Sequence, residues 1–435
     1  MKIAKNPVEN FINHSTSGSF ILIACTIIAL IWANSPWQDA YHALWASDFS
    51  LGFTDTTFAI TKPLYLWIND GLMTLFFLYV GLEIKREIID GELTSFKKAS
   101  MPVFAALGGI VVPIALFFLL NQEDRGTHGW GIPMATDIAF SLGILQLLGK
   151  RVPLGLKVFL TTFAVIDDIG AIVVIAIFYS HGFHVEYLSV AIGLLLILWL
   201  LNYLQIFSKY LFLIFGLAIW VLFLKSGVHP TIAGVLLAFV LPSVRYVNLK
   251  DVFSNLNNNL KRLKESDPKK HVLTEEQQVA VDEINAVTDQ VQSPMQQLEH
   301  GLSGWVAIVI MPLFALANAG ITINLNSLSA THLISQIGIS MVAGKVIGIS
   351  LFSYLAYKLG IARLPAGIQF KDIFAVSILG GVGFTMSLFV AELAFREDDL
   401  LTASKLGILI GSFGAGIVGY FALRIQLKRK TKQTD

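Results

Sequence analysis

The sequence predicts an all-α polytopic membrane protein of about twelve transmembrane helices, with inverted repeats and two broken helices. Composition is the first reason. Hydrophobic residues make up 55% of the 435 residues and charged residues only 14%, whereas about a quarter of the residues of a globular chain are charged. The mean hydropathy is +0.68. Apolar runs also recur almost to the C-terminus, which a soluble core would not need.

Charge and cysteine content exclude some classes of function. The formal net charge is +1, so no global basic field argues for a nucleic-acid partner. The single cysteine, Cys25, excludes an intramolecular disulfide framework.

Eight helices are expected within residues 1–242. We interpret the first apolar run, 19–33, as an uncleaved helix, because similar runs follow it without a clear cleavage site. Between Ser50 and Thr61 the residues alternate as in a strand, which indicates a small surface hairpin. The next seven helices are expected at about 63–89, 102–120, 131–143, 157–179, 188–203, 211–224 and 231–241.

A polar segment, 243–303, separates these helices from the last four. It is rich in lysine, and its sequence Thr274-Glu-Glu-Gln resembles a helix N-cap. We therefore expect a cytoplasmic linker with helical content that does not span the membrane. Residues 304–435 are expected to hold helices nine to twelve and a basic cytoplasmic tail, within one membrane domain overall. These helices are placed at about 305–321, 333–357, 373–395 and 405–423, with the tail at 424–432.

The distribution of lysine and arginine agrees with twelve spans, because cytoplasmic loops carry an excess of these residues. With both termini in the cytoplasm, the basic loops share one side, and acidic or neutral loops such as 122–124 and 397–399 lie on the other. Lys225 is the main exception. The loop residues that set this orientation are Lys85, Arg86, Lys97, Lys98, Lys150, Arg151, Lys209, Lys358, Arg363 and Lys371.

Two adjacent carboxylates, Asp167 and Asp168, lie in the middle of the apolar run 157–179. One carboxylate at the centre of a membrane helix costs about 2.5–3.5 kcal/mol on an insertion scale. Two in succession must be neutralised, hydrated or bound to a cation. An Asp-Asp pair more often caps a helix or lies on a solvated surface, but the apolar flanks leave no solvated surface here. The pair therefore indicates a functional site.

Two of the expected helices are interrupted. Pro133 and Asp137 interrupt the run 131–143, and the glycine-rich stretch 380–387 interrupts helix eleven. Each broken helix is the second in a block of three, helices three to five and ten to twelve. Breaks at matching places in two blocks are typical of an inverted-repeat transporter with its site at mid-membrane. The alternative is that the glycines serve close helix packing.

Lys345 is a second buried charge, with apolar residues for roughly ten positions on either side. The alternative is that its side chain snorkels to the membrane interface, but the distance is long. A buried anionic partner is the better interpretation, and the obvious mid-membrane anions are Asp137, Asp167 and Asp168.

Six segments of the sequence form an ordered set of motifs. They are Ala135-Thr-Asp-Ile-Ala-Phe140, Val165-Ile-Asp-Asp-Ile-Gly-Ala171, Ser226-Gly-Val-His229, Pro312-Leu-Phe-Ala-Leu-Ala-Asn-Ala-Gly320, Gly344-Lys345 and Gly383-Phe-Thr-Met-Ser387. Together these segments resemble the NhaA sodium/proton antiporters, over nearly all spanning regions. NhaA transporters are themselves built from inverted repeats, so the resemblance and the matching breaks are not independent indications. The chain departs from the family in its long linker, 243–303, and at Glu392, for which we have no role.

The resemblance implies a role for each site residue. Asp167 and Asp168 match the pair that binds sodium and carries protons. Asp137, with Thr136, matches the crossing of the broken helices, where the aspartate offsets the positive half-helix ends. Lys345 matches the lysine that offsets the opposite ends and pairs with Asp167. The cluster associated with pH response is matched by Glu83, Arg86, Glu87, Glu299 and His300.

The resemblance also implies a function. It is electrogenic, pH-regulated export of sodium or lithium in exchange for protons across the bacterial inner membrane, by a secondary transporter that is not an enzyme and needs no cofactor. Partners would be sodium ions, protons and the lipid bilayer, and a homodimer through the hairpin between Ser50 and Thr61 stays open.

Ion chemistry supports this function independently of the resemblance. Sodium, like calcium, is a hard cation that prefers oxygen ligands, and carboxylates also bind protons, so the two ions compete for one site. A passive cation channel is the nearest alternative. An intramembrane aspartyl protease would need a Gly-x-Gly-Asp signature, which the chain lacks. A retinal protein does not fit twelve spans with broken helices.

Overall fold

The computed structural model describes residues 15–52, 60–121, 124–180, 182–243, 249–264, 274–322, 331–365 and 367–434. Parts of the sequence predictions therefore lie outside the described residues. They are the polar segment before residue 15, the tip of the expected hairpin at 53–59, most of the acidic loop at 122–124, and the stretches 244–248 and 265–273 of the expected linker.

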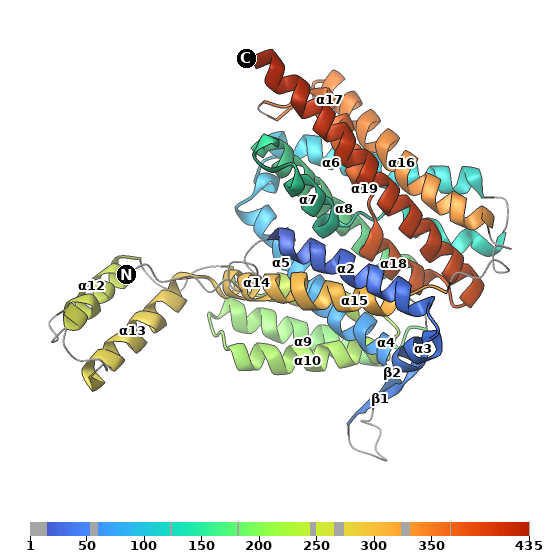
Figure 1. The fold of residues 1–435 in the computed structure, drawn as a ribbon. Helices are drawn as coiled ribbons and strands as arrows, with labels where there is room; N and C mark the ends of the chain where they lie inside the picture. Colours follow the sequence, from blue (N-terminus) through green and yellow to red (C-terminus); the bar gives the residue numbers. More distant parts are fainter. Residues whose placement is uncertain are drawn as a thin grey trace.

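Most of the described chain is a bundle of long helices that run between two opposite ends of the molecule (Figure 1). At one end, the helices α12 (Leu249–Lys264) and α13 (Glu275–Val291) project away from the bundle. At the other end, the strands β1 (Asp48–Leu51) and β2 (Ile60–Pro63) pair antiparallel, which confirms the expected hairpin. We call these two ends the linker side and the hairpin side.

The first half of the chain contains the segments that we expected as helices one to eight. α2 (Ser15–Ala33) is followed by α3 (Gln38–Ala46), which is bent by 114° from it and so does not continue it. The segments that follow the hairpin are α4 (Leu64–Trp67), the π-helix η1 (Ile68–Leu72), α5 (Met73–Ile89), the 3₁₀ helix η2 (Glu92–Thr94), α6 (Phe96–Leu120), the 3₁₀ helix η3 (Asp124–Met134), α7 (Ile138–Leu147), the 3₁₀ helix η4 (Gly149–Arg151), α8 (Leu154–Phe178), α9 (Val185–Tyr203), α10 (Lys209–Ser226) and α11 (Pro230–Val240).

The second half differs from the sequence prediction at three boundaries. The helix expected from about residue 305 begins at Pro294, because Ser293 and Gln296 form a capping box and proline suits the first helical position. The last helix, expected at about 405–423, begins earlier, at Asp398. It also continues through the expected basic tail, since nothing between 424 and 432 breaks it. The elements are α14 (Pro294–Trp305), the π-helix η5 (Val306–Ile310), α15 (Met311–Asn318), α16 (Thr331–Lys358), α17 (Phe370–Gly380), α18 (Phe384–Ala394) and α19 (Asp398–Thr434).

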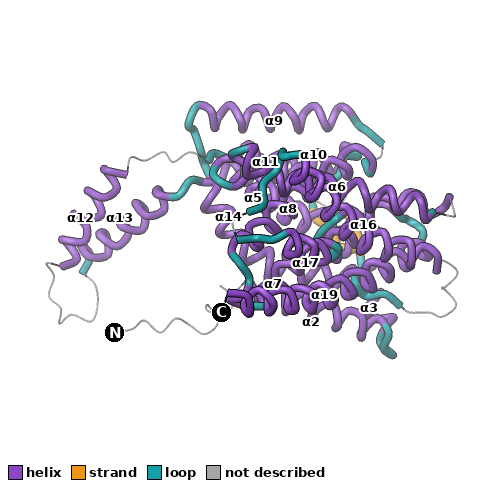
Figure 2. Tube along the Cα trace, turned by 90° about the horizontal axis from the view of Figure 1, so that it is seen from above, coloured by secondary structure: helices purple, strands orange, loops and turns teal. Residues whose placement is uncertain are grey.

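Twelve segments of the described chain run across the bundle, in agreement with the sequence. Eight helices are long and apolar enough to span a membrane alone, and the pair α17–α18, bent by 45°, forms a further span. The helix α2, the short helix α11 and the broken segment η3–α7 complete the set. Figure 2 shows α9 at the outer edge of the bundle, where its exposed apolar side chains suit contact with lipid.

The first helices of the two three-helix blocks, α6 and α16, pack against each other at glycines. A Cβ atom added to Gly108 would collide with the carbonyl oxygen of Gly348, and one added to Gly348 would collide with that of Gly108. Such a reciprocal contact is what a two-fold relation between the blocks produces. It brings α6 and α16 close enough to hold α8, with its two aspartates, beside Lys345.

Candidate functional site

The two broken segments meet in the middle of the bundle. Between η3 and α7, residues 135–137 are non-helical after Pro133, and between α17 and α18 the helix stops at residues 381–383, which include two glycines. The breaks lie against each other, because the amide of Asp137 donates to the carbonyl of Val382 at 2.7 Å. The interruptions that the sequence indicates therefore form one crossing.

Asp137 caps two half-helices at once. Its carboxylate accepts hydrogen bonds from the amide of Phe140 at 2.9 Å, in the first turn of α7, and from the amide and hydroxyl of Thr385 at 3.1 and 2.5 Å, in the first turn of α18. The positive ends of both half-helices thus face one buried anion. This geometry supports the offsetting role that the resemblance implies for Asp137.

Hydroxyl groups form hydrogen bonds with further backbone groups that the breaks leave without a partner in a helix. Thr136 donates to the carbonyl of Gly380 at 3.0 Å, and Ser141 donates to that of Leu379 at 2.9 Å, at the C-terminus of α17. Ser412 accepts from the amide of Phe384 at 3.0 Å. Sequence reasoning missed Ser141, Ser412 and Thr385, since a lone hydroxyl in an apolar run has no distinctive pattern. Ser141 and Thr385 could have been found by their nearness to the breaks in the sequence, whereas Ser412 is near neither break.

Lys345 makes a buried ion pair with Asp167. Its ammonium donates to both carboxylate oxygens, at 2.7 and 2.8 Å, and both side chains are fully buried. The ring of Phe163 lies 5.6 Å from the ammonium, which adds a cation–π contact. Of the three anions that the sequence offered, the fold selects Asp167. The resemblance also implies that Lys345 offsets the C-terminal ends of the half-helices. The hydroxyls of Thr136 and Ser141 already bond the carbonyls at the end of α17, so this role of Lys345 stays a prediction.

Asp168 is the carboxylate without a full set of partners. Its side chain is buried, and its Oδ1 atom has no hydrogen-bond partner among the described residues. A buried polar atom that lacks a partner is costly and calls for a ligand or water. Asp168 also lines a cavity of about 640 Å³, so an ion in the cavity lies beside this side chain.

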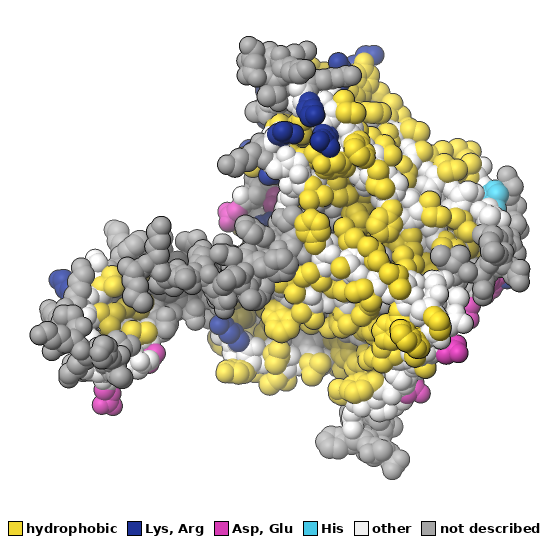
Figure 3. Space-filling model, in the orientation of Figure 1, with side chains coloured by type: hydrophobic (Ala, Val, Ile, Leu, Met, Phe, Trp, Pro, Cys, Tyr) yellow, Lys and Arg dark blue, Asp and Glu magenta, His cyan; other side chains and the backbone are white. Residues whose placement is uncertain are grey.

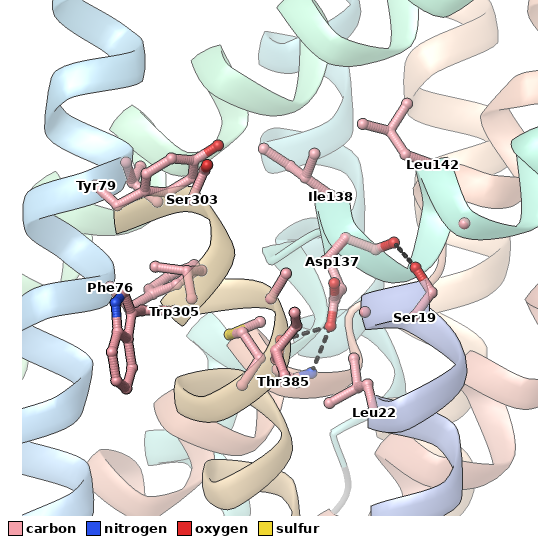
Figure 4. Close-up of a pocket in the computed structure, with 18 of the residues that line it drawn as sticks. Ser19, Leu22, Phe76, Tyr79, Asp137, Ile138, Leu142, Ser303, Trp305 and Thr385 are labelled. Carbon is pink, nitrogen blue, oxygen red and sulfur yellow. Dashed lines mark hydrogen bonds between the residues drawn. The ribbon is translucent and has the colours of Figure 1, made fainter. Parts of the chain in front are cut away.

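The cavity opens toward the linker side. Its lining comes from α2, α5, α7, α8, α18 and the helix from α14 to η5, and includes His300, Gly301 and Ser303 in the second half of α14. Figure 4 shows Asp137 and Thr385 joined by dashed lines at the cavity, opposite Tyr79 and Trp305. Thr136 lines the cavity with Asp137 and Asp168, whereas Asp167 and Lys345 do not. Side-chain oxygens of Thr136, Asp137 and Asp168 are therefore brought together at the lining of one cavity.

The residues expected to respond to pH lie near the mouth of this cavity. Arg86 is 2.5 Å from Glu299, 3.3 Å from Glu87 and 3.7 Å from Glu83. The cluster joins α5 to α14, and Glu83 and His300 line the cavity. The structure thus brings together four of the five expected residues through Arg86 and places His300 beside them.

The chain is similar to proteins that are named as sodium/proton antiporters. The model of the family described as Na+/H+ antiporter 1 matches residues 9–423. A relative from Serratia proteamaculans, named Na(+)/H(+) antiporter NhaA, is 45% identical over 429 residues, which cover 98% of this chain and 99% of the relative. A relative of the same name from Oleidesulfovibrio alaskensis is 42% identical, covering 97% of this chain and 94% of the relative.

Proposed function

Since this chain belongs to the Na+/H+ antiporter 1 family, we propose that it exports sodium in exchange for protons through Asp168 and its neighbours. Membership makes it a multi-pass bacterial membrane protein and a sodium/proton antiporter. The observation that carries the proposed site is the unpartnered, buried oxygen of Asp168 at the end of an open cavity.

In the proposed mechanism, sodium and protons compete for the same carboxylates. A sodium ion entering the cavity reaches Asp168, with oxygens of Asp137, Thr136 and Thr385 nearby. Protons that bind Asp167 and Asp168 displace it. Lys345 stabilises Asp167 while no cation is bound. Because one site alternately faces the two sides, exchange needs no separate coupling device. Two carboxylates can carry more than one proton per sodium ion, which would make the exchange electrogenic.

The proposed orientation places the linker side and both termini in the cytoplasm of the bacterial inner membrane. On the face seen in Figure 3, lysine and arginine side chains gather near the linker side and the C-terminus, whereas the hairpin side shows acidic side chains and a histidine. This asymmetry supports the orientation, because cytoplasmic loops are enriched in lysine and arginine. The cavity would then open to the cytoplasm, where sodium is collected.

A homodimer through the β1–β2 hairpin belongs to the same proposal. All four residues of β1 are exposed, and Phe49 and Leu51 are apolar side chains exposed by 51% and 56%. Such residues on a protruding two-stranded sheet suit pairing with a second copy, since an unpaired strand edge is a template for another strand.

Proteoliposomes test the function directly. We expect a sodium or lithium gradient, and not a potassium gradient, to drive proton movement, with a membrane potential changing its rate. A passive cation channel is not favoured, because the relatives are named as antiporters. Sodium flux without coupled proton movement would contradict antiport.

The cluster around Arg86 is proposed to set the pH response, with substitution of its acids as the test. At saturating sodium, competition at Asp168 is suppressed, so a change in pH profile reports on the cluster itself. We expect Glu83→Gln and Glu87→Gln to shift the midpoint of the profile, because each removes a titratable contact of Arg86. Asp90→Asn, at the exposed end of α5, is the matched control. Profiles that superimpose on the wild type would leave an anchoring ion-pair cluster.

A further inference from the structure

One face of α18 carries three different kinds of side chain on its way from the crossing to the hairpin side. Thr385, Phe389 and Glu392 are four and three residues apart, so they share a helix face. Thr385 contacts Asp137 in the cavity. The two residues beyond it mark an aromatic layer and a polar layer, and the mechanism above uses neither.

The aromatic layer closes the way from the cavity to the hairpin side. The ring of Phe389 lies 5.5 Å from that of Phe77, on α5, and 6.4 Å from that of Phe314, on α15. All three side chains are buried. An apolar layer without polar partners is a barrier to an ion. In this state a cation at Asp168 reaches the linker side and not the hairpin side.

Beyond the rings lies a buried polar layer on the same two helical spans that carry Phe77 and Phe314. Asn69, in the π-helix η1, and Asn318, at the end of α15, exchange amide hydrogen bonds of 3.2 and 2.8 Å. Both side chains are buried. Buried amides that bond each other across two helices hold the helices together and also offer oxygen atoms to a passing cation, and π-helical turns are frequent at functional sites.

Glu392 is the carboxylate of this outer region. It pairs with Lys405 of α19 at 2.6 Å, and the two side chains are only 12% and 14% exposed. The pair repeats the arrangement at the centre of the molecule, where the ammonium of Lys345 holds the carboxylate of Asp167 while no cation is bound.

We propose that Glu392 is an outer site for a monovalent cation, which receives sodium from Asp168 when Phe77, Phe314 and Phe389 separate. In the closed state Lys405 occupies the carboxylate, so no charge is left unpaired in an apolar setting. An arriving sodium ion displaces the ammonium and leaves from there to the hairpin side. This inference rests on the proposed function, and it gives a role to Glu392, for which the resemblance implies none.

Sided transport kinetics test the site. We compare everted and right-side-out membrane vesicles, which present sodium to opposite ends of the protein. Glu392→Gln should raise the sodium KM from the hairpin side by roughly tenfold, the size of losing one charge-assisted contact, and leave the KM from the linker side unchanged. Lys405→Gln should lower the hairpin-side KM, because it removes the competitor. Glu397→Gln, an exposed acid on the same side paired with Arg125, should change neither value.

The opposite signs of the two variants separate a cation site from a structural ion pair. If the pair is merely structural, breaking it should change the sodium KM in the same direction in both variants, or equally from both sides. Either result overturns the proposal. An unchanged hairpin-side KM overturns it as well. Exchange from the linker side in the wild type checks the proposed function separately. If that exchange is absent, the function itself fails.

A labelling experiment covers the case in which the charge variants do not fold. In a Cys25→Ser background, Asn318→Cys places a thiol in the polar layer just outside the rings. We expect a membrane-impermeant thiol reagent to label it from the hairpin side only, at a rate that depends on sodium. Complete protection with and without sodium, or labelling from the linker side, would contradict an outer path at this place.

Discussion

Asp168→Asn is expected to abolish sodium-driven proton exchange while leaving the protein folded. The amide keeps the shape of the side chain but removes the anionic ligand and the proton carrier. Loss of a charged contact of about 3 kcal/mol corresponds to roughly a hundredfold, so residual activity should be near background. The measurement is sodium-dependent proton release from proteoliposomes that contain the purified variant. Near-normal release would refute the assignment of Asp168.

The same substitution should not lower the melting temperature. Because the Oδ1 atom of Asp168 lacks a partner among the described residues, replacing the carboxylate removes a buried charge without breaking a contact that the structure shows. Asp372→Asn is the matched control, since Asp372 is also fully buried but caps the start of α17 by accepting from the amide of Gln369. We expect that variant to keep exchange activity. Loss of folding in Asp168→Asn would make its effect structural.

Lys345→Ala is expected to lower both stability and exchange. Removing one partner of a buried ion pair leaves an uncompensated charge and typically costs about 3–5 kcal/mol, and here Asp167 would be that charge. Lys345→Arg keeps the positive charge and should retain more activity, although its planar guanidinium must fit beside Phe163 and Gly109. Thermal unfolding in detergent and proteoliposome transport measure the two effects.

A double variant separates the charge from the packing of the lysine stem. If the uncompensated carboxylate causes the loss, Asp167→Asn combined with Lys345→Ala should recover part of the melting temperature. Packing of the lysine stem against Gly109 is lost in either case. A double variant as unstable as Lys345→Ala alone would assign the effect to packing. Unchanged stability of Lys345→Ala would argue against the buried pair.

The membrane spans were predictable because each one can be recognised from the hydropathy of a single stretch of sequence. A membrane helix needs a long apolar run, so runs such as 157–179 could be identified one by one, and the structure has α8 at Leu154–Phe178. The breaks were visible for the same reason, because Pro133 and the glycines before Phe384 stand out against apolar surroundings. The start of α14 was missed, since its first turns are polar and the helix signal there is the cap at Ser293.

The partners of the site residues depended on distances that the sequence does not contain. From the pattern of residues alone, Asp137, Asp167 and Asp168 were equal candidates for Lys345, and only the resemblance indicated Asp167. The structure has the pair with Asp167, at the place where α6 and α16 make their close contact at Gly108 and Gly348. Likewise, Ser412 is 28 residues from the amide that it bonds, and no local pattern connects the two.

By itself, the sequence determined that two carboxylates and one lysine must lie within the membrane, because hydropathy along one chain decides which residues leave water. Only the tertiary structure decided which carboxylate is neutralised and which stays open. That choice depends on how broken helices from distant parts of the chain cross. Asp137 is held by half-helix ends, Asp167 by Lys345, and Asp168 alone faces the cavity with an oxygen that no described residue bonds.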